Sequence, residues 1–176
     1  MRCCDEIKFS RLISFDPNLR LSLWKTPEEA RKRILYGMKQ CDIMKISEEE
    51  VAFVSEQESL EKGVSFIRDN SDIKILFVTL GNKGSIAYYK DEKIYCRGIH
   101  QEHVVDTTGA VDTFCGAVLS RILELGTDAL TEKDIREMLL FANAAASIVV
   151  TRKGALCSMP EPEEIRAASS LIDKVL

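Results

Sequence analysis

Short apolar segments alternate with amphipathic helical segments along the first half of the 176-residue chain. Strands that are joined by helices run parallel, because a parallel pair needs a long crossover connection. The order therefore predicts an α/β fold with three layers, in which a mainly parallel sheet carries helices on both faces. The strands are expected at residues 11–16, 42–46 and 73–80, and the helices at 27–40, from Ser47 onward, and at 57–69.

The second half of the chain predicts a hairpin and three helices. Residues 85–90 and 93–98 flank Asp91-Glu92, a turn that is typical of an antiparallel hairpin. The helices are expected at 110–125, with Gly126 as the C-cap, at 131–152 and at 163–176. Residues 1–176 are expected to form a single domain that is incomplete in front, because only ten residues precede the first predicted strand.

Charge and hydropathy exclude several classes of protein. The 24 basic and 28 acidic residues give a net charge of -4 without a basic stripe, so nucleic acid is not an expected partner. No run reaches the ~18 apolar residues of a membrane-spanning helix, and the polar start of the chain does not resemble a signal peptide. We therefore expect a cytoplasmic protein without a membrane partner, whose six scattered cysteines are reduced thiols.

Residues 106–114 lead from a loop into a predicted helix and are the strongest candidate for a ligand site. In α/β sheets ligands bind beyond the carboxyl ends of the strands. Neither a Walker A loop nor a dinucleotide-binding glycine motif is present. Successive amides and the positive end of a helix at 106–114 suit a phosphate group. Asp112 lies in this first turn, where an acidic residue either stabilises the helix end or serves the chemistry.

The segment from Asp106 to Ala117 closely resembles a family signature. It reads D-T-T-G-A-V-D-T-F-C-G-A, and the second signature of the PfkB or ribokinase-like carbohydrate kinases reads D-T-T-G-A-G-D-T-F-x-G-A. The fructokinase-like members are the most similar. Supporting segments follow in family order at 16–20, 45–50, 78–84, 143–146 and 154–155. The resemblance covers nearly the whole chain but corresponds to the carboxyl-terminal part of a family kinase, without the amino-terminal half and the lid.

The resemblance implies a ribokinase-like, Rossmann-like fold and an ATP-dependent sugar kinase. It makes Asp112 the general base that takes a proton from the sugar hydroxyl while the γ-phosphate of ATP is transferred. The amides of Gly109, Ala110, Val111 and Asp112 would form the anion hole. The resemblance leaves fructose, ribose, a 2-keto-3-deoxy acid and a nucleoside as alternative acceptors, and overall likeness favours fructose.

Further residues take a nucleotide role by resemblance, each with a structural alternative. Thr79, Gly81 and Gly84 match a segment that lines the nucleotide in the family, or they form a strand end and a turn. Asn143 matches a residue on the adenine side, or it is a polar residue within a buried helix.

Cation sites are also implied by the resemblance. Glu50 would lie near the water ligands of Mg²⁺, although Ser47 and Glu50 also fit a capping box that needs no metal. Asp106 and Thr108 match positions whose oxygens bind a monovalent cation such as K⁺.

The loop after the first strand is a third candidate. Asp16, Asn18 and Arg20 would border the phosphate site, or Asp-Pro-Asn forms a turn only.

Val111 is the one departure from the signature, which has glycine at this position. A β-branched residue would cost on the order of 1 to 2 kcal/mol if φ had to be positive. The amide is retained, so we expect crowding and weaker γ-phosphate binding. A catalytically silent remnant of a kinase and a regulatory nucleotide-binding or interaction module are therefore alternatives to the enzyme. Self-association is expected through the exposed sheet edge at Ile13 and Phe15.

Overall fold

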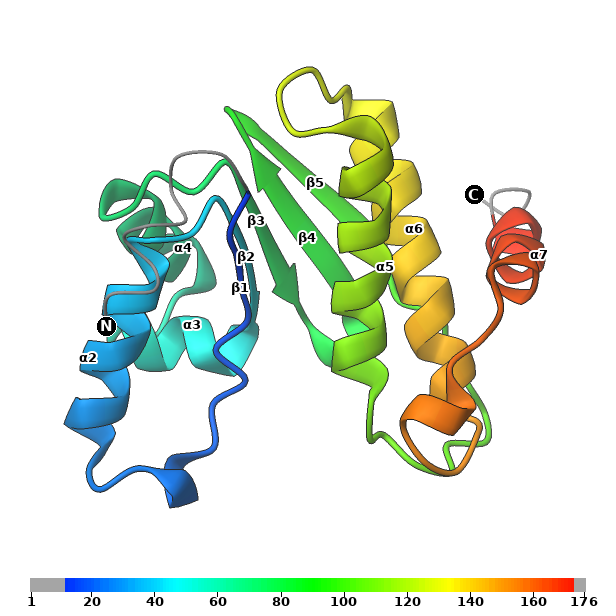
Figure 1. The fold of residues 1–176 in the computed structure, drawn as a ribbon, viewed down its shortest axis with the longest axis horizontal. Coiled ribbons are helices and arrows are strands. Elements are labelled where there is room, and N and C mark those ends of the chain that lie inside the picture. The colour runs from blue at the N-terminus through cyan, green and yellow to red at the C-terminus, as the bar shows by residue number, and fades with distance from the viewer. Residues whose placement is uncertain (1–11, 173–176) are drawn as a thin grey trace. The chain divides into compact units, whose positions relative to one another are not determined.

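The computed structural model describes residues 12–172 (Figure 1). The chain divides into two compact units, which are Met1–Thr79 with Tyr88–Asp91, and Leu80–Ala87 with Glu92–Leu176. Five strands form one mixed sheet in the order β1-β2-β3-β4-β5. The expectation of a single domain over residues 1–176 stays a prediction.

The first unit contains three parallel strands and three helices. The strands are β1 (Ser14–Phe15), β2 (Ile43–Ser47) and β3 (Ile75–Thr79), and the helices are α2 (Pro27–Met38), α3 (Glu48–Ser55) and α4 (Leu60–Asp69). Ser14 pairs with Ile43, and Ile43 pairs with Ile75. The three helices lie on the same side of these strands (Figure 1). The predicted parallel strands are confirmed in this unit.

Local side chains explain where these elements begin. Thr26 accepts the amide of Glu29 and caps α2, and Pro27 occupies the first helical position, as the sequence predicts. α4 begins at Leu60 rather than at residue 57, because the Ser59 side chain caps it. The first strand is shorter than expected. The amide of Ile13 donates to the Asp42 side chain at 2.9 Å instead of joining the ladder.

The strands β4 (Gly84–Tyr89) and β5 (Glu92–Arg97) are joined by two residues only, so they form an antiparallel hairpin. The three remaining helices are α5 (Ala110–Leu125), α6 (Glu132–Val149) and α7 (Pro162–Ile172). Short 3-10 helices cover Leu21–Leu23, Gly81–Lys83 and Leu156–Ser158. α5 has the predicted bounds and ends at Gly126. Residues 173–176 of the predicted last helix lie outside the described residues.

In the second unit α6 packs against α5, β5 and α7, and α5 and α6 lie side by side (Figure 1). Its alanines Ala142, Ala144 and Ala145 are fully buried, which permits close contact between helices. α6 ends before residue 152 because the chain turns after Val149.

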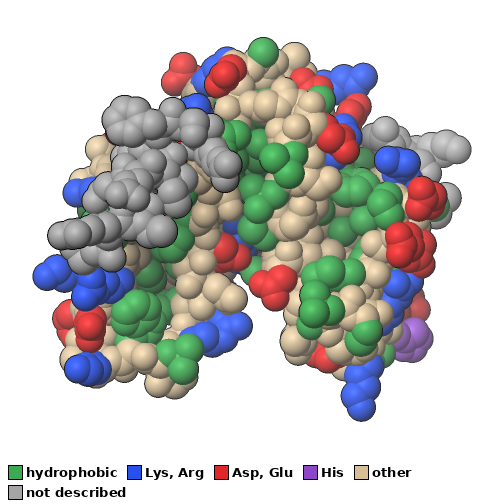
Figure 2. All heavy atoms as spheres, viewed as in Figure 1, with side chains coloured by type: hydrophobic (Ala, Val, Ile, Leu, Met, Phe, Trp, Pro, Cys, Tyr) green, Lys and Arg blue, Asp and Glu red, His purple; other side chains and the backbone are tan. Residues whose placement is uncertain are grey.

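The described residues have charges of both signs on the surface and carry free thiols. On the face shown in Figure 2, Lys and Arg side chains lie among Asp and Glu side chains. No helix within residues 12–172 is long and apolar enough to span a bilayer. The described cysteines, Cys41, Cys96, Cys115 and Cys157, are free thiols, while Cys3 and Cys4 lie outside the described residues.

Candidate functional site

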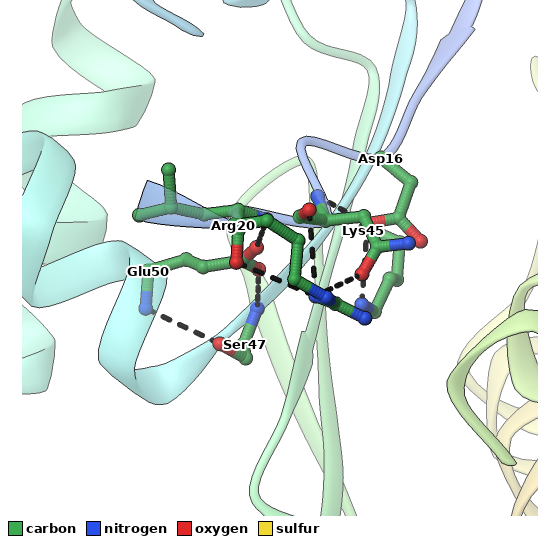
Figure 3. Close-up of polar contacts among 7 residues, drawn as sticks. Asp16, Arg20, Lys45, Ser47 and Glu50 are labelled. Carbon is green, nitrogen blue, oxygen red and sulfur yellow. Dashed lines mark hydrogen bonds and ion pairs between the residues drawn. The ribbon is translucent and has the colours of Figure 1, made fainter. Parts of the chain in front are cut away.

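Ser47 and Glu50 form a reciprocal capping box at the start of α3 (Figure 3). The Ser47 hydroxyl accepts the Glu50 amide at 3.2 Å, and Glu50 Oε2 accepts the Ser47 amide at 2.8 Å. The structural alternative for this pair is therefore confirmed.

The second oxygen of Glu50 reaches the loop that follows β1. Glu50 Oε1 accepts the amide of Leu19 at 2.6 Å, and the side chain is buried. Each carboxylate oxygen can accept more than one hydrogen bond, so the group retains capacity for a metal-bound water. Among the described residues, no group of three or more His, Cys, Asp or Glu side chains is placed to hold a metal directly. The position of Glu50 fits a contact to Mg²⁺ through a water molecule. The described residues do not form a set of direct metal ligands.

The loop after β1 is a tight turn that positions Arg20. Asp16 Oδ1 accepts the Asn18 amide at 3.2 Å, and Asn18 has a positive φ of 43°. Arg20 Nη1 then donates to Asn18 Oδ1 at 2.8 Å (Figure 3). Asp-Pro-Asn thus makes the turn, and the same turn holds the exposed Arg20 guanidinium.

Lys45 joins this cluster from β2, and sequence reasoning did not assign it a role. Its Nζ lies 3.3 Å from Asp16 Oδ1, and the lysine side chain is only 3% exposed. Burial raises the pKa of Asp16, while the charge and hydrogen bond of Lys45 act in the opposite direction. The signal in the sequence was a lysine between Met44 and Ile46 in an otherwise apolar strand.

In the second unit, α5 begins at a glycine that no other residue could replace without strain. Gly109 has φ of 83°, and a Cβ at this position would lie 3.1 Å from the Cα and Cβ atoms of Ala155. A larger residue would meet both the left-handed backbone and the packed loop. The signature glycine and the matching Gly154-Ala155 segment are therefore in contact.

Three amides at this helix end form no hydrogen bond within residues 12–172: those of Gly109, Val111 and Asp112. The Ala110 amide donates to the Thr107 carbonyl at 3.3 Å, and the Thr113 amide to the Gly109 carbonyl at 2.8 Å. Of the predicted anion hole, the Ala110 amide is thus engaged in a turn. The amides of Gly109, Val111 and Asp112 remain without a partner among the described residues.

The side chains of this first turn are accessible except for one. Asp112 is exposed, and Val111 is 40% exposed. Val111 does not have a positive φ, so the backbone strain considered for this substitution does not arise. The Thr113 hydroxyl is buried and has no hydrogen-bond partner among the described residues, a feature that sequence reasoning missed.

Asp106 ties the loop before α5 to the loop after α6. Its Oδ1 accepts the Thr108 amide at 2.9 Å, and its Oδ2 accepts the Gly154 amide at 3.2 Å. Hydrogen bonds from the Thr108 side chain and amide, and then from Gly154, lower the pKa of Asp106. The carboxylate is therefore held charged beside Thr108, as a cation site at this pair requires.

The predicted nucleotide residues make mainly structural contacts. Thr79 ends β3 and is half-buried. Gly81 has a positive φ, and a Cβ on Gly84 would lie 2.2 Å from the Cys96 carbonyl oxygen across the hairpin. These positions fit the strand-end and turn alternative.

Asn143 is buried, and its amide is used within the second unit. Its Oδ1 accepts the Ser85 hydroxyl at 3.0 Å. Its Nδ2 donates to the carbonyls of Cys96 and Arg97 at 3.2 and 3.3 Å. α6 is thus fastened to the hairpin, and an adenine contact for Asn143 stays a prediction.

Relatives of known identity were found by sequence. Residues 1–162 match the family model described as pfkB family carbohydrate kinase. Fructokinase-1 of Oryza sativa subsp. japonica is 41% identical over 157 residues, covering 88% of this chain and 47% of the relative. Fructokinase-1 of Zea mays is 41% identical over 160 residues, with coverage of 88% and 47%. The chain spans about half the length of these curated relatives.

Solved structures of carbohydrate and riboside kinases are similar to this chain in fold. A double mutant of fructokinase from Vibrio cholerae O395, with fructose, ADP and potassium ion bound, has a TM-score of 0.84 at 31% identity, covering 93% of this chain and 52% of that one. Aminoimidazole riboside kinase from Salmonella enterica, with its riboside and an ATP analogue, has a TM-score of 0.78 at 26% identity, with coverage of 90% and 52%. The expected ribokinase-like fold is confirmed.

Proposed function

The chain belongs to the pfkB family of carbohydrate kinases, and we propose that it forms the carboxyl-terminal part of a fructokinase-like enzyme. This enzyme transfers the γ-phosphate of ATP to a sugar hydroxyl. The observation that carries the proposal is the start of α5, where three unpaired amides and the exposed side chain of Asp112 belong to the same helix end.

The helix end supplies what phosphoryl transfer needs most. Free amides at a helix N-terminus and the positive end of its dipole stabilise phosphoryl oxygens. The amides of Gly109, Val111 and Asp112 take this role. Val111 keeps its donor but places a branched, half-exposed side chain at the site, so phosphate binding is weaker than with glycine.

Asp112 takes the proton of the acceptor hydroxyl. A positioned general base contributes typically ~10² to 10⁴ in rate. The carboxylate is solvent-accessible and forms no ion pair among the described residues, so an acceptor can approach it.

Further residues take cation and nucleotide roles by the family resemblance, in each of the two units separately. Mg²⁺, when bound, neutralises charge that develops on the phosphoryl oxygens. Glu50 would hold a water of that ion, and Arg20 would border the phosphates. Asp106 and Thr108 bind a monovalent cation such as K⁺ beside the helix end. Thr79, Gly81, Gly84 and Asn143 are the proposed nucleotide-side residues.

Fructose is the proposed acceptor, because the plant relatives and the Vibrio neighbour are named as fructokinases. The Salmonella neighbour is named as a riboside kinase, so a riboside is the second acceptor to compare with fructose.

A second function is favoured by Val111, whose branched, half-exposed side chain lies at the start of α5 where the signature has glycine. With phosphate binding impaired in this way, the chain would retain nucleotide binding without transfer. It would then be a silent remnant or a regulatory nucleotide-binding module.

One assay separates the two functions. ADP release is measured with ATP, Mg²⁺ and either fructose or a riboside, for the chain and for Asp112→Asn and Asp91→Asn. Asp91 lies in the exposed hairpin turn and serves as the control. The kinase proposal expects fructose-dependent ADP release that Asp112→Asn lowers by about 10² or more and Asp91→Asn leaves unchanged. Nucleotide binding without sugar-dependent release would support the silent alternative.

A further inference from the structure

Lys45 is a buried cation with fewer partners than its chemistry requires. It lies in the middle of β2 between Met44 and Ile46, both fully buried, and is itself 3% exposed. Lysine is almost never buried to this extent unless it is paired. An ammonium group has three donors, and the described residues give Lys45 a single acceptor, Asp16 Oδ1 at 3.3 Å.

Asp16 is only a partial partner for this ammonium. The same oxygen, Oδ1, also accepts the Asn18 amide at 3.2 Å. The Asp16 side chain is itself largely buried, which weakens its hold on a full negative charge. Two donors of Lys45 therefore remain to be satisfied within a largely apolar environment.

The other charges of the cluster do not supply the missing acceptor. Glu50 accepts the amides of Leu19 and Ser47, and no hydrogen bond or ion pair joins it to Lys45 among the described residues. Within residues 12–172, Arg20 donates only to neutral oxygens of Asn18 and Leu19, and it adds a second positive charge (Figure 3). Lys45 thus contacts the Asp16 carboxylate, while Arg20 is held by Asn18 in the same turn and has no carboxylate partner among the described residues. A cluster with two cations and one such carboxylate is suited to an anion with several acceptor oxygens.

We infer that Lys45 contacts a phosphoryl group in this cluster, with Asp16 holding the ammonium in place. This inference rests on the proposed function and adds a residue to it. The anion is a phosphoryl oxygen of the nucleotide or of a sugar phosphate, since both present the same chemistry. The free donors of Lys45 bind the phosphoryl oxygen. The Asp16 carboxylate lowers the affinity of the cluster for this anion by repulsion.

The experiment measures binding of tripolyphosphate, ATP, adenosine and a hexose phosphate to the full chain by calorimetry. Four proteins are compared: the unchanged chain, Lys45→Met, Asp16→Asn with Lys45→Met, and Lys32→Met. Lys32 is an exposed lysine on α2 and is the matched control. The double variant removes both buried charges together, and its thermal unfolding midpoint shows that the fold is retained.

We expect Lys45→Met and the double variant to bind tripolyphosphate and ATP about tenfold more weakly or worse, with adenosine binding unchanged. Lys32→Met should bind all four ligands as the unchanged chain does. Loss of ATP affinity with unchanged hexose phosphate affinity assigns the contact to the nucleotide, and the reverse assigns it to the sugar phosphate.

The outcomes separate this inference from the proposed function. If ATP binds and neither Lys45 variant weakens it or the hexose phosphate, the inference is wrong and the proposed function stands. If no nucleotide binds but tripolyphosphate binding depends on Lys45, the proposed function fails and the phosphoryl contact stands. If the unchanged chain binds none of the anions, both are overturned.

Discussion

Glu50 accepts the amide of Leu19 at 2.6 Å across thirty-one positions of the sequence, while its other oxygen holds the amide of Ser47. One buried carboxylate therefore fixes both the start of α3 and the loop after β1. That loop carries Asp16 and Arg20, which lie with Lys45 in the cluster proposed to bind a phosphoryl group. The position of this loop therefore depends on a residue that also belongs to a helix capping box.

Replacing Glu50 with alanine should destabilise the chain markedly. The change leaves the amides of Leu19 and Ser47 unpaired and removes half of the capping box, so the free energy of unfolding should fall by about 2 to 3 kcal/mol. Glu49→Ala, one position earlier and exposed, should change it by less than about 0.5 kcal/mol. Urea unfolding of both variants makes the comparison. Equal, small changes would show that the double contact of Glu50 is unimportant for stability.

Two glycines of the signature segment should respond oppositely to alanine. Gly109→Ala places a Cβ at positive φ and 3.1 Å from Ala155, so unfolding should become easier by about 1 to 2 kcal/mol. Gly116 lies inside α5 with open space around it, and Gly116→Ala should stabilise the chain by up to about 1 kcal/mol. Thermal unfolding midpoints that move in the same direction would contradict this account of Gly109.

Asp16 should titrate above the ordinary aspartate pKa of about 3.9. Lys45→Met removes the charge and the hydrogen bond of Lys45, which lower the pKa of Asp16, so the titration of Asp16 should move further upward. The folded chain then binds a proton that the unfolded chain releases. The contribution of Asp16 to stability is therefore largest below about pH 4 and declines as pH rises through its folded pKa. Carboxyl-carbon NMR measures the titration of Asp16. A midpoint at or below about pH 3.9 would refute the prediction of a raised pKa.

Self-association is expected through β1, which lies at the end of the strand order. An edge strand presents unpaired backbone groups that a second copy can pair with. Ser14→Lys places a charge on this exposed edge position and should reduce association in sedimentation experiments. A chain that stays monomeric at high concentration, with Ser14→Lys behaving identically, would argue against this surface.

The sequence predicted the fold well where local signals agree with packing. Thr26 with Pro27 gave the start of α2, and the bounds of α5 followed from its apolar spacing and Gly126. β1 was overestimated, because Asp42 satisfies the Ile13 amide through its side chain. No local pattern reports such a contact between distant residues.

The candidate site was predicted in part. The family signature identified the helix end at Gly109 and Asp112, but which amides are free depends on the turn bond of Ala110 to Thr107. Lys45 was missed because its partner, Asp16, is distant in sequence. The roles of Asn143 and Glu50 stay predictions, and their hydrogen bonds to Ser85 and Leu19 join residues that are distant in the sequence.

The central claim, that the start of α5 holds phosphoryl oxygens beside Asp112, is tested most directly by amide NMR during titration with ATP and Mg²⁺. The amide resonances of Gly109, Val111 and Asp112 should shift in a saturable manner, and that of Ala110, already bonded to Thr107, should shift less. Adenosine should leave these resonances in place. If ATP binds while the three amides do not shift, or shift equally with adenosine, the helix end is not the phosphate site.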